Sequence, residues 1–268
     1  MPLLAPSILS FIFGAIVGSF LNVVSLRFNT GMTLGGRSKC MTCGTTLTWK
    51  ELVPIVSFLA QKGSCKRCKS TISWQYPLVE FIAGIIFVLI FITFPPVSYV
   101  AAAQTLLYII AACLLVVIAV YDIKHKIIPD TFNYAFAALA LLTLFVGGGS
   151  WWHVPGFWSL IAGPLLAIPF ALLWLVSRGR WMGLGDGKLM LGIGWMTGVA
   201  AGINAIIVSF WIAAAVSVVW LFITYKRFKP KTEVPFGPYL ILGMYLVILF
   251  NIQVLDVALL KDIIFGLF

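Results

Sequence analysis

The stretch VAAAQTLLYIIAACLLVVIAVY, residues 100–121, is mostly apolar and carries no charged side chain. An α-helix needs ~20 mostly apolar residues to cross the hydrocarbon core of a bilayer. The whole chain of 268 residues is 62% hydrophobic and only 10% charged, whereas soluble domains carry about 25% charged residues. The composition therefore excludes an ordinary soluble or disordered protein and predicts a polytopic membrane protein.

Further apolar stretches on both sides of residues 100–121 predict additional spans. One region, 189–225, is too long for a single span, and we divide it near residues 198–204. The result is an all-α membrane protein with about eight transmembrane helices and a small polar insert. We expect three parts: a first helix in 1–26, the insert in 27–77 and a membrane domain in 78–268. The other predicted spans are 4–26, 78–94, 132–146, 157–176 and 239–255.

The charge balance sets the expected orientation. The chain has 18 Lys and Arg against 8 Asp and Glu, a formal net charge of +10. With the N-terminus outside, 17 of the 18 cations fall on the inner side, and Lys261 is the exception. Cytoplasmic loops of membrane proteins are rich in Lys and Arg, so the cations are explained without a nucleic-acid partner. We therefore expect both termini outside and a cytoplasmic insert. The inner segments are 27–77, 122–131, 177–188 and 226–238.

The insert contains two CxxC pairs, Cys40-Met-Thr-Cys43 and Cys65-Lys-Arg-Cys68. Two such pairs at this spacing resemble a zinc ribbon, in which four thiolates close a tetrahedral Zn²⁺ site. A closed site leaves no position for a catalytic water, so the predicted metal is structural. Two disulfides or four free thiols are the alternatives, but disulfides are rare in the cytoplasm.

Asp122 and Asp186 are the two acidic residues with the most specific placement. Asp122 follows the span at 100–121, and Asp186 lies in Gly183-Leu-Gly-Asp186 before another span. The topology places both at the cytoplasmic mouth of the bundle, where an unpaired carboxylate is costly. Two close carboxylates cannot both ionise, so they share a proton and can hydrolyse an amide. The structural alternatives are a helix cap for Asp186 and, for Asp122, an ion pair with Lys124 or Lys126.

Six sequence motifs then occur in the order of one known family. They are Gly18-Ser-Phe-Leu-Asn-Val-Val24, the two CxxC pairs preceded by Arg37-Ser-Lys39, Ile72-Ser-Trp-Gln-Tyr-Pro-Leu-Val-Glu80, Asp122 with Ile128-Pro-Asp130, Gly183-Leu-Gly-Asp186 with Lys188, and Pro235-Phe-Gly-Pro238. The chain resembles the bacterial type IV prepilin peptidases (leader peptidase/N-methyltransferases), which belong to the GxGD class of membrane aspartic proteases. It departs from the family at Met41, where Pro is common.

The resemblance implies that Asp122 and Asp186 are the catalytic pair. It also implies prepilin and pseudopilin substrates, cleavage after Gly on the cytoplasmic side of the bacterial inner membrane, and methylation of the new N-terminus with S-adenosylmethionine. Membrane lipid is the other expected contact. No residue is assigned to cofactor binding, and the oligomeric state is not predicted. The remaining expected site residues are Gly183, Gly185 and Lys188 as support, and Glu80 and Asp130 as contacts of the basic leader.

Two alternative functions stay open at this point. One is a GxGD peptidase that lacks methyltransferase activity, because the sequence has no Gly-rich cofactor loop on a Rossmann unit. The other is a membrane transporter or scaffold in which the zinc ribbon is a docking module. In that case Asp122 and Asp186 would be ion-path or structural residues.

Overall fold

The computed structural model describes residues 4–146, 151–224 and 234–256. Within these ranges all regular elements are helices, accompanied by isolated β-bridges. Part of the predicted inner segment 226–238, and Lys261, lie outside the described residues. The elements are α1 (Leu4–Arg27), η1 (Trp49–Glu51), α2 (Val56–Ala60), α3 (Gln75–Thr93), α4 (Tyr99–His125), α5 (Asp130–Thr143), α6 (Phe157–Ser177), α7 (Leu184–Thr224) and α8 (Gly237–Phe250).

The helices confirm the all-α membrane fold that the sequence predicts. Five of them, α1, α3, α4, α6 and α7, are long and apolar enough to cross a membrane. Helix α8 is apolar but shorter, and α5 has 14 residues. Helix α7 runs for 41 residues, with a break at Gly198, inside the region where the sequence predicts a division. The count of eight crossings stays a prediction, since length and composition identify five.

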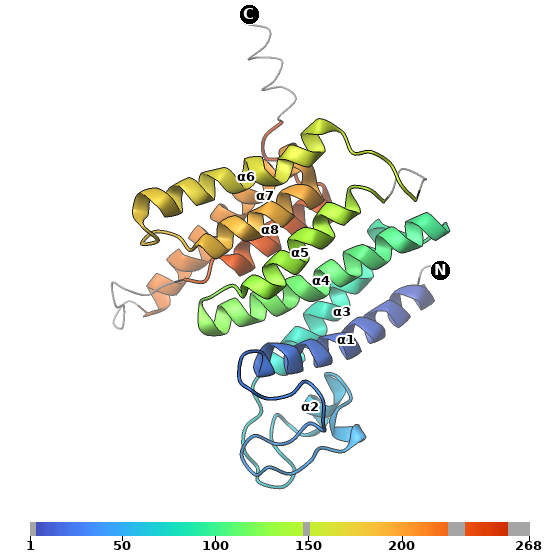
Figure 1. Ribbon diagram of the computed structural model, residues 1–268. Coiled ribbons are helices and arrows are strands. Elements are labelled where there is room, and N and C mark those ends of the chain that lie inside the picture. Colours follow the sequence, from blue (N-terminus) through green and yellow to red (C-terminus); the bar gives the residue numbers. More distant parts are fainter. Residues whose placement is uncertain (1–3, 147–150, 225–233, 257–268) are drawn as a thin grey trace, which may run out of the picture. The chain divides into compact units, whose positions relative to one another are not determined.

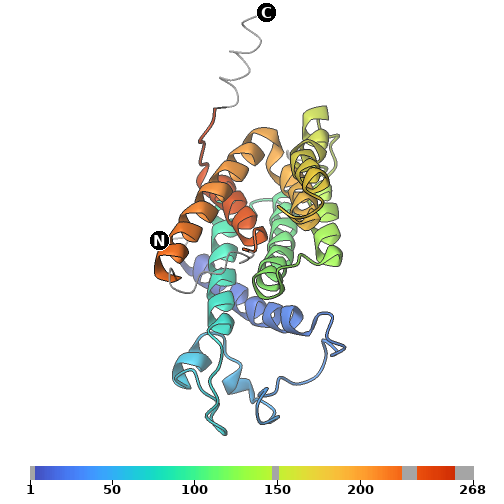
Figure 2. The same ribbon diagram turned by 90° about the vertical axis from the view of Figure 1, so that its left-hand side faces the viewer.

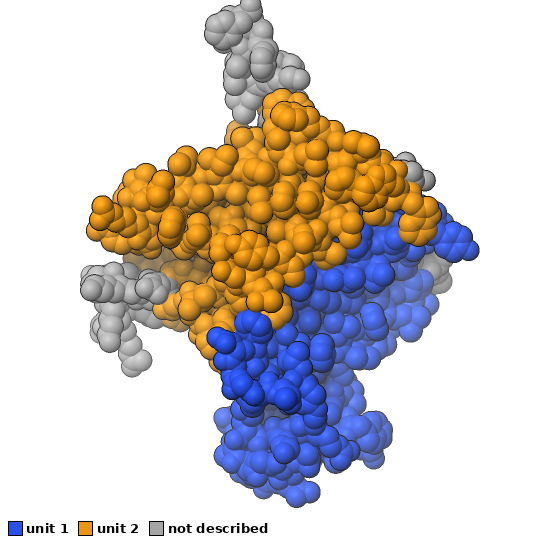
Figure 3. All heavy atoms as spheres, viewed as in Figure 1, with its two compact units in different colours: residues 1–120 blue, residues 121–268 orange. Residues whose placement is uncertain are grey.

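The described chain forms two compact units, residues 1–120 and 121–268, which Figure 3 colours separately. The division falls within α4, so residues 121–125 at the end of this helix are grouped with the second unit. Each unit is described by itself below.

In the first unit, α1 packs closely against α3 because glycines line the contact. A Cβ atom placed on Gly14 would lie 2.8 Å from the carbonyl oxygen of Ala83, and one on Gly18 would lie 2.9 Å from the Cβ of Ala83. Small residues four positions apart are a common device for bringing membrane helices together. The insert between α1 and α3 lies at one end of this helix pair (Figure 2).

In the second unit, α7 packs against α5, α6 and α8 (Figure 1). Glycines again allow the close approach: a Cβ on Gly194 would lie 2.6 Å from the carbonyl oxygen of Ala162 in α6. The same test on Gly192 meets the ring of Phe136 in α5 at 2.5 Å. This packing fixes the N-terminal end of α7, where Asp186 lies, against its neighbours.

Candidate active site and metal site

Asp122 lies in the last turn of α4 and is buried, with 4% of its surface exposed. Its Oδ2 atom accepts a hydrogen bond of 3.1 Å from the backbone N–H of Gly237, the first residue of α8. The first N–H groups of a helix have no partner within the helix and favour a negative charge. Within the described residues Asp122 forms no ion pair with Lys124 or Lys126.

Asp186 lies in the first turn of α7 and is also buried. Its carboxylate accepts a hydrogen bond from the backbone of Gly183, and the charge of Asp122 acts on it directly. The structure therefore brings together the two carboxylates that the sequence singles out, although they come from distant parts of the chain. Each carboxylate receives a backbone N–H at the start of a helix.

Ile128, which the sequence marked as part of the motif after Asp122, has a packing role that the motif did not reveal. A Cβ atom placed on Gly185 would lie 3.0 Å from the Cβ of Ile128, and one on Gly237 would lie 3.1 Å from its Cδ1. This buried side chain therefore packs against both backbone segments that hold the aspartates. It reaches them because α4 ends at His125 and Lys126 adopts a left-handed conformation with φ 58°.

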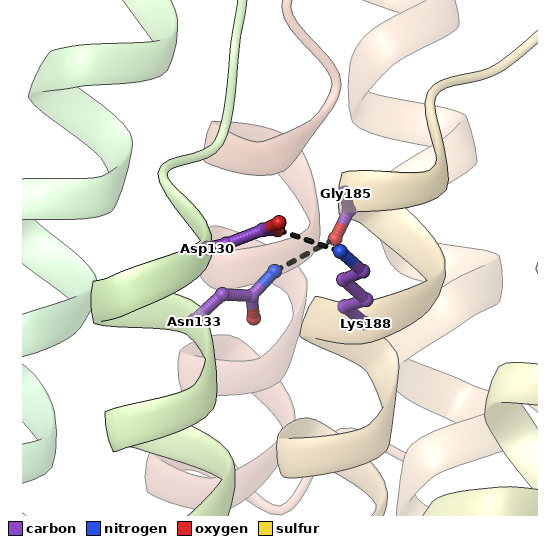
Figure 4. Close-up of polar contacts among 4 residues, drawn as sticks. All are labelled: Asp130, Asn133, Gly185 and Lys188. Carbon is purple, nitrogen blue, oxygen red and sulfur yellow. Dashed lines mark hydrogen bonds and ion pairs between the residues drawn. The ribbon is translucent and has the colours of Figure 1, made fainter.

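Two residues in the first turn of α5 contact Gly185 and Lys188 of α7 (Figure 4), which precede and follow Asp186 in the sequence. Asn133 donates a hydrogen bond of 3.0 Å from Nδ2 to the carbonyl oxygen of Gly185. Asp130 forms a 2.7 Å ion pair with Lys188. Three predicted supporting residues thus lie next to Asp186: Gly183, Gly185 and Lys188. The predicted leader contact Asp130 forms an ion pair with Lys188.

Substitution of Gly237 by alanine is expected to lower catalytic activity about 10- to 100-fold, the range for a misplaced reacting group. The new Cβ would lie 2.7 Å from Oδ2 of Asp122, so this carboxylate must move. Initial rates at saturating substrate measure the effect. Gly156→Ala is the matched control, since a Cβ there meets no atom within 4 Å. Equal activity of the two variants would contradict the placement of Asp122.

Glu80 belongs to the first unit and is buried there. Its Oε2 accepts a 2.7 Å hydrogen bond from the backbone N–H of Ile55 in the insert, and Ser19 of α1 also hydrogen-bonds to it. Ile55 has φ 62°, a strained value for a β-branched residue. Glu80 thus fastens the insert to the α1–α3 pair, and one of its oxygens is already used in doing so.

The four cysteines of the insert gather into one cluster. The sulfur atoms of Cys40, Cys43, Cys65 and Cys68 all lie within 4.8 Å of one another. Those of Cys40 and Cys68 are 3.8 Å apart, which is about the separation of two thiolates on a tetrahedral Zn²⁺ with 2.3 Å bonds. The donor set and spacing fit the predicted zinc, with all four positions filled by sulfur.

The two CxxC pairs form the same local structure twice. Antiparallel bridges join Lys39 to Thr46 and Ser64 to Thr71. Within each turn, the N–H of the first cysteine donates to the residue five positions later (2.9 Å in both). The residue four positions after that cysteine is left-handed in both turns, Gly44 with φ 69° and Lys69 with φ 59°. This repeat aims two sulfurs from each turn at a common centre.

Two of the four cysteines, Cys40 and Cys68, favour the thiolate that a metal requires, whereas the pKa of Cys65 is raised. Backbone N–H groups of Cys43 and Thr42 lower the pKa of Cys40 to about 6. Hydrogen bonds from the side chain and backbone of Ser70 lower the pKa of Cys68. The thiols of Cys40 and Cys68, which lie in the insert outside the membrane helices, therefore lose their protons to a metal cation more readily.

The left-handed positions of the two turns, Gly44 and Lys69, are expected to respond differently when each receives the residue of the other, and the measured quantity is zinc affinity. Gly44→Lys is expected to weaken zinc binding about fivefold, equal to roughly 1 kcal/mol, because the backbone conformation is strained for a residue with a Cβ. No atom lies within 4 Å of that Cβ, so the backbone is the sole cause. Lys69→Gly should hold zinc at least as tightly as the wild type. Titration with a competing chelator measures both, and equal affinities would contradict the shared geometry.

A buried pair of carboxylates in an all-helical membrane chain is the arrangement that a membrane aspartic peptidase requires. Comparison with known proteins gives the family. Residues 12–94 match the bacterial peptidase A24 N-terminal domain, and residues 109–219 match the type IV leader peptidase family. With the relatives described next, these matches show that the chain belongs to the type IV leader peptidase family.

Curated relatives are similar over almost the whole chain. A prepilin leader peptidase/N-methyltransferase of Bacillus subtilis is 32% identical over 92% of this chain and 95% of its own. The enzyme of that name from Xanthomonas campestris is 28% identical over 91% of each chain. A type 4 prepilin-like proteins leader peptide-processing enzyme of Escherichia coli is 27% identical over 89% of this chain and 92% of its own. No solved structure matches the chain.

Proposed function

We propose that this protein is a membrane aspartic endopeptidase that removes the leader peptide from type IV prepilins and pseudopilins and then methylates the new N-terminus. The observation that carries the peptidase activity is the buried pair of Asp122 and Asp186, each hydrogen-bonded to the N–H of a glycine at a helix start. The names of the similar enzymes carry both the substrate and the methylation.

The proposed cleavage uses one proton shared by the two carboxylates. The ionised carboxylate takes a proton from water, whose oxygen attacks the carbonyl carbon of the scissile glycine. The protonated carboxyl donates its proton to the leaving amide nitrogen, and the C–N bond breaks to give a carboxylic acid and an amine. The dyad ends with its proton on the other residue. Burial keeps bulk water from competing with these transfers.

For the methylation, S-adenosylmethionine would supply the methyl group when bound, and we assign no residue of the chain to its binding. The four thiolates of the insert would hold Zn²⁺ as a structural ion, since a fully protein-bound tetrahedral site offers no open position. We place the methyltransferase region in residues 27–77 and the peptidase in 78–268. The contact from Glu80 to Ile55 supports the view that the insert is ordered by the membrane helices.

We place the protein in the bacterial inner membrane, as its resemblance to bacterial prepilin peptidases implies, and the distribution of cations supports a site that faces the cytoplasm. The insert carries 8 of the 18 Lys and Arg residues, and such an excess is typical of cytoplasmic segments. Both termini would then lie outside. In this orientation the apolar helix of the pilin enters from the bilayer and its basic leader stays at the cytoplasmic face, near Asp130 and the lipid head groups.

The proposal is tested by incubating membranes that contain the protein with a prepilin and S-adenosylmethionine labelled in its methyl group. We expect a shortened pilin that begins after the glycine and carries label on its new N-terminus. Cleavage without label would leave a peptidase that lacks methyltransferase activity. An intact prepilin, in the presence of zinc-loaded and folded protein, would overturn the proposed peptidase.

A further inference from the structure

Two residues of α5 contact α7 close to Asp186. Asn133 bonds to Gly185, immediately before Asp186 in the sequence, and Asp130 pairs with Lys188, two residues after it (Figure 4). We propose that Asn133 is a positioning residue for Asp186, and that the ion pair between Asp130 and Lys188 assists it. This inference rests on the proposed function, because it assigns Asp186 to the reaction.

Asn133 is completely buried, and its side-chain amide forms one hydrogen bond within the described residues. Its Nδ2 donates to the carbonyl oxygen of Gly185, the residue that precedes Asp186, at 3.0 Å. Its Oδ1 atom has no hydrogen-bond partner among the described residues. A buried amide that is only half satisfied is unfavourable for stability compared with an apolar side chain of similar size. What Asn133 provides that leucine cannot is therefore the N–H held against Gly185.

The target of this hydrogen bond is a segment that needs an external support. Gly183 and Gly185 flank the turn into α7, and glycine restrains its backbone less than any other residue. Ile128 packs against Gly185 but does not fix the orientation of its peptide group, because a van der Waals contact is not directional. The hydrogen bond from Asn133 fixes the orientation of the peptide group that leads directly into Asp186.

The ion pair adds a second, weaker restraint on the same turn. The Nζ atom of Lys188 lies 2.7 Å from Oδ1 of Asp130 and 5.1 Å from the centre of the Tyr134 ring. The Asp130 side chain is 61% exposed, so solvent screens this pair. Exposed pairs of this kind change equilibria by at most about fivefold. Asn133 should accordingly have the larger effect of the two.

The test compares Asn133→Leu with a matched control, Asn204→Leu. Asn204 is also a buried asparagine of the second unit, and it lies in α7 far along the helix from Asp186. Its Oδ1 accepts hydrogen bonds from the backbone N–H groups of Val254 and Leu255. For Asn133→Leu we expect kcat to fall about 10- to 100-fold, KM to change less than about threefold, and the melting temperature to equal or exceed that of the wild type. For Asn204→Leu we expect a lower melting temperature and a kcat within about threefold.

A second measurement follows the backbone directly and needs no substrate. Hydrogen–deuterium exchange of peptides covering residues 183–192 should be faster in Asn133→Leu than in the wild type, and unchanged in Asn204→Leu. Lys188→Met should lower kcat by no more than about fivefold, with recovery in Lys188→Arg, which keeps the pair.

The outcomes separate this inference from the proposed function. If the wild type cleaves and Asn133→Leu has a normal kcat and normal exchange, the positioning role is overturned while the peptidase stands. A lower kcat accompanied by a proportionate loss of melting temperature would also overturn it, because the role would be merely structural. If the wild type does not cleave, the peptidase fails, and unchanged exchange in Asn133→Leu would still reject the support of the Gly185 turn.

Discussion

Replacement of Asp122 or Asp186 by asparagine is expected to lower prepilin cleavage by at least about 10³-fold. An amide cannot accept the proton of the attacking water or donate one to the leaving nitrogen as a carboxyl pair does. Asparagine and aspartate side chains have nearly the same size, so the packing around these two buried positions should be preserved. Because the two residues act as one unit, the double variant should be no less active than either single variant.

Cleavage of a prepilin in membranes by the wild type and the three variants provides the measurement. Asp256→Asn serves as the control, since Asp256 lies exposed near the end of the described chain. A melting temperature close to that of the wild type gives an independent check that each variant is folded. Near-normal cleavage by both single variants would refute the catalytic pair. The transporter or scaffold interpretation of the chain would then have to be tested.

Substitution of a cysteine in the insert is expected to remove the metal almost completely. Cys65→Ser replaces a buried thiolate by a hydroxyl that does not ionise at neutral pH, which leaves three sulfur ligands and an opening in the shell. Structural zinc contributes an apparent binding free energy of about 10–16 kcal/mol in small zinc domains at pH 7. An insert of this size has little core of its own, so it should lose its structure together with the ion.

Metal analysis of the purified protein should give one zinc per chain for the wild type and almost none for Cys65→Ser. Limited trypsin digestion should then cut the variant within the insert, at cations such as Lys66 and Arg67, much faster than the wild type. Cys113→Ser is the matched control, because Cys113 lies in α4, outside the cluster. A full zinc content in Cys65→Ser would show that the metal is held elsewhere.

The membrane helices were the most predictable part of this chain. Apolar runs are long and uninterrupted, and a helix is the way such a run satisfies its backbone in lipid. The boundaries are less predictable: α4 continues to His125, past the predicted end at residue 121, and α7 begins at Leu184 rather than at 189. In both cases polar residues extend the helix beyond the apolar run, where hydrophobicity gives no signal.

The candidate site was predictable in its charged and sulfur-containing residues but not in its supports. Asp122, Asp186 and the cysteines stand out because such groups are costly or reactive in a membrane protein. Ile128 was part of a recognised motif, but its packing role gave no signal, and Asn133 looks like any polar residue of a helix. Their roles depend on contacts with Gly185, which arise only when α5 and the segment that precedes it pack on α7.

The break at Gly198 has a consequence for how the enzyme tolerates different lipids. Its backbone, with φ 76° and ψ 177°, interrupts the regular hydrogen-bond ladder of α7. The part before the break carries Asp186, whereas the part after it extends for more than five further turns of apolar helix. Helices that exceed the local bilayer thickness respond by tilting. We therefore expect a tilt of the later part to be absorbed at Gly198, so that variations in membrane thickness leave the alignment of the two aspartates undisturbed.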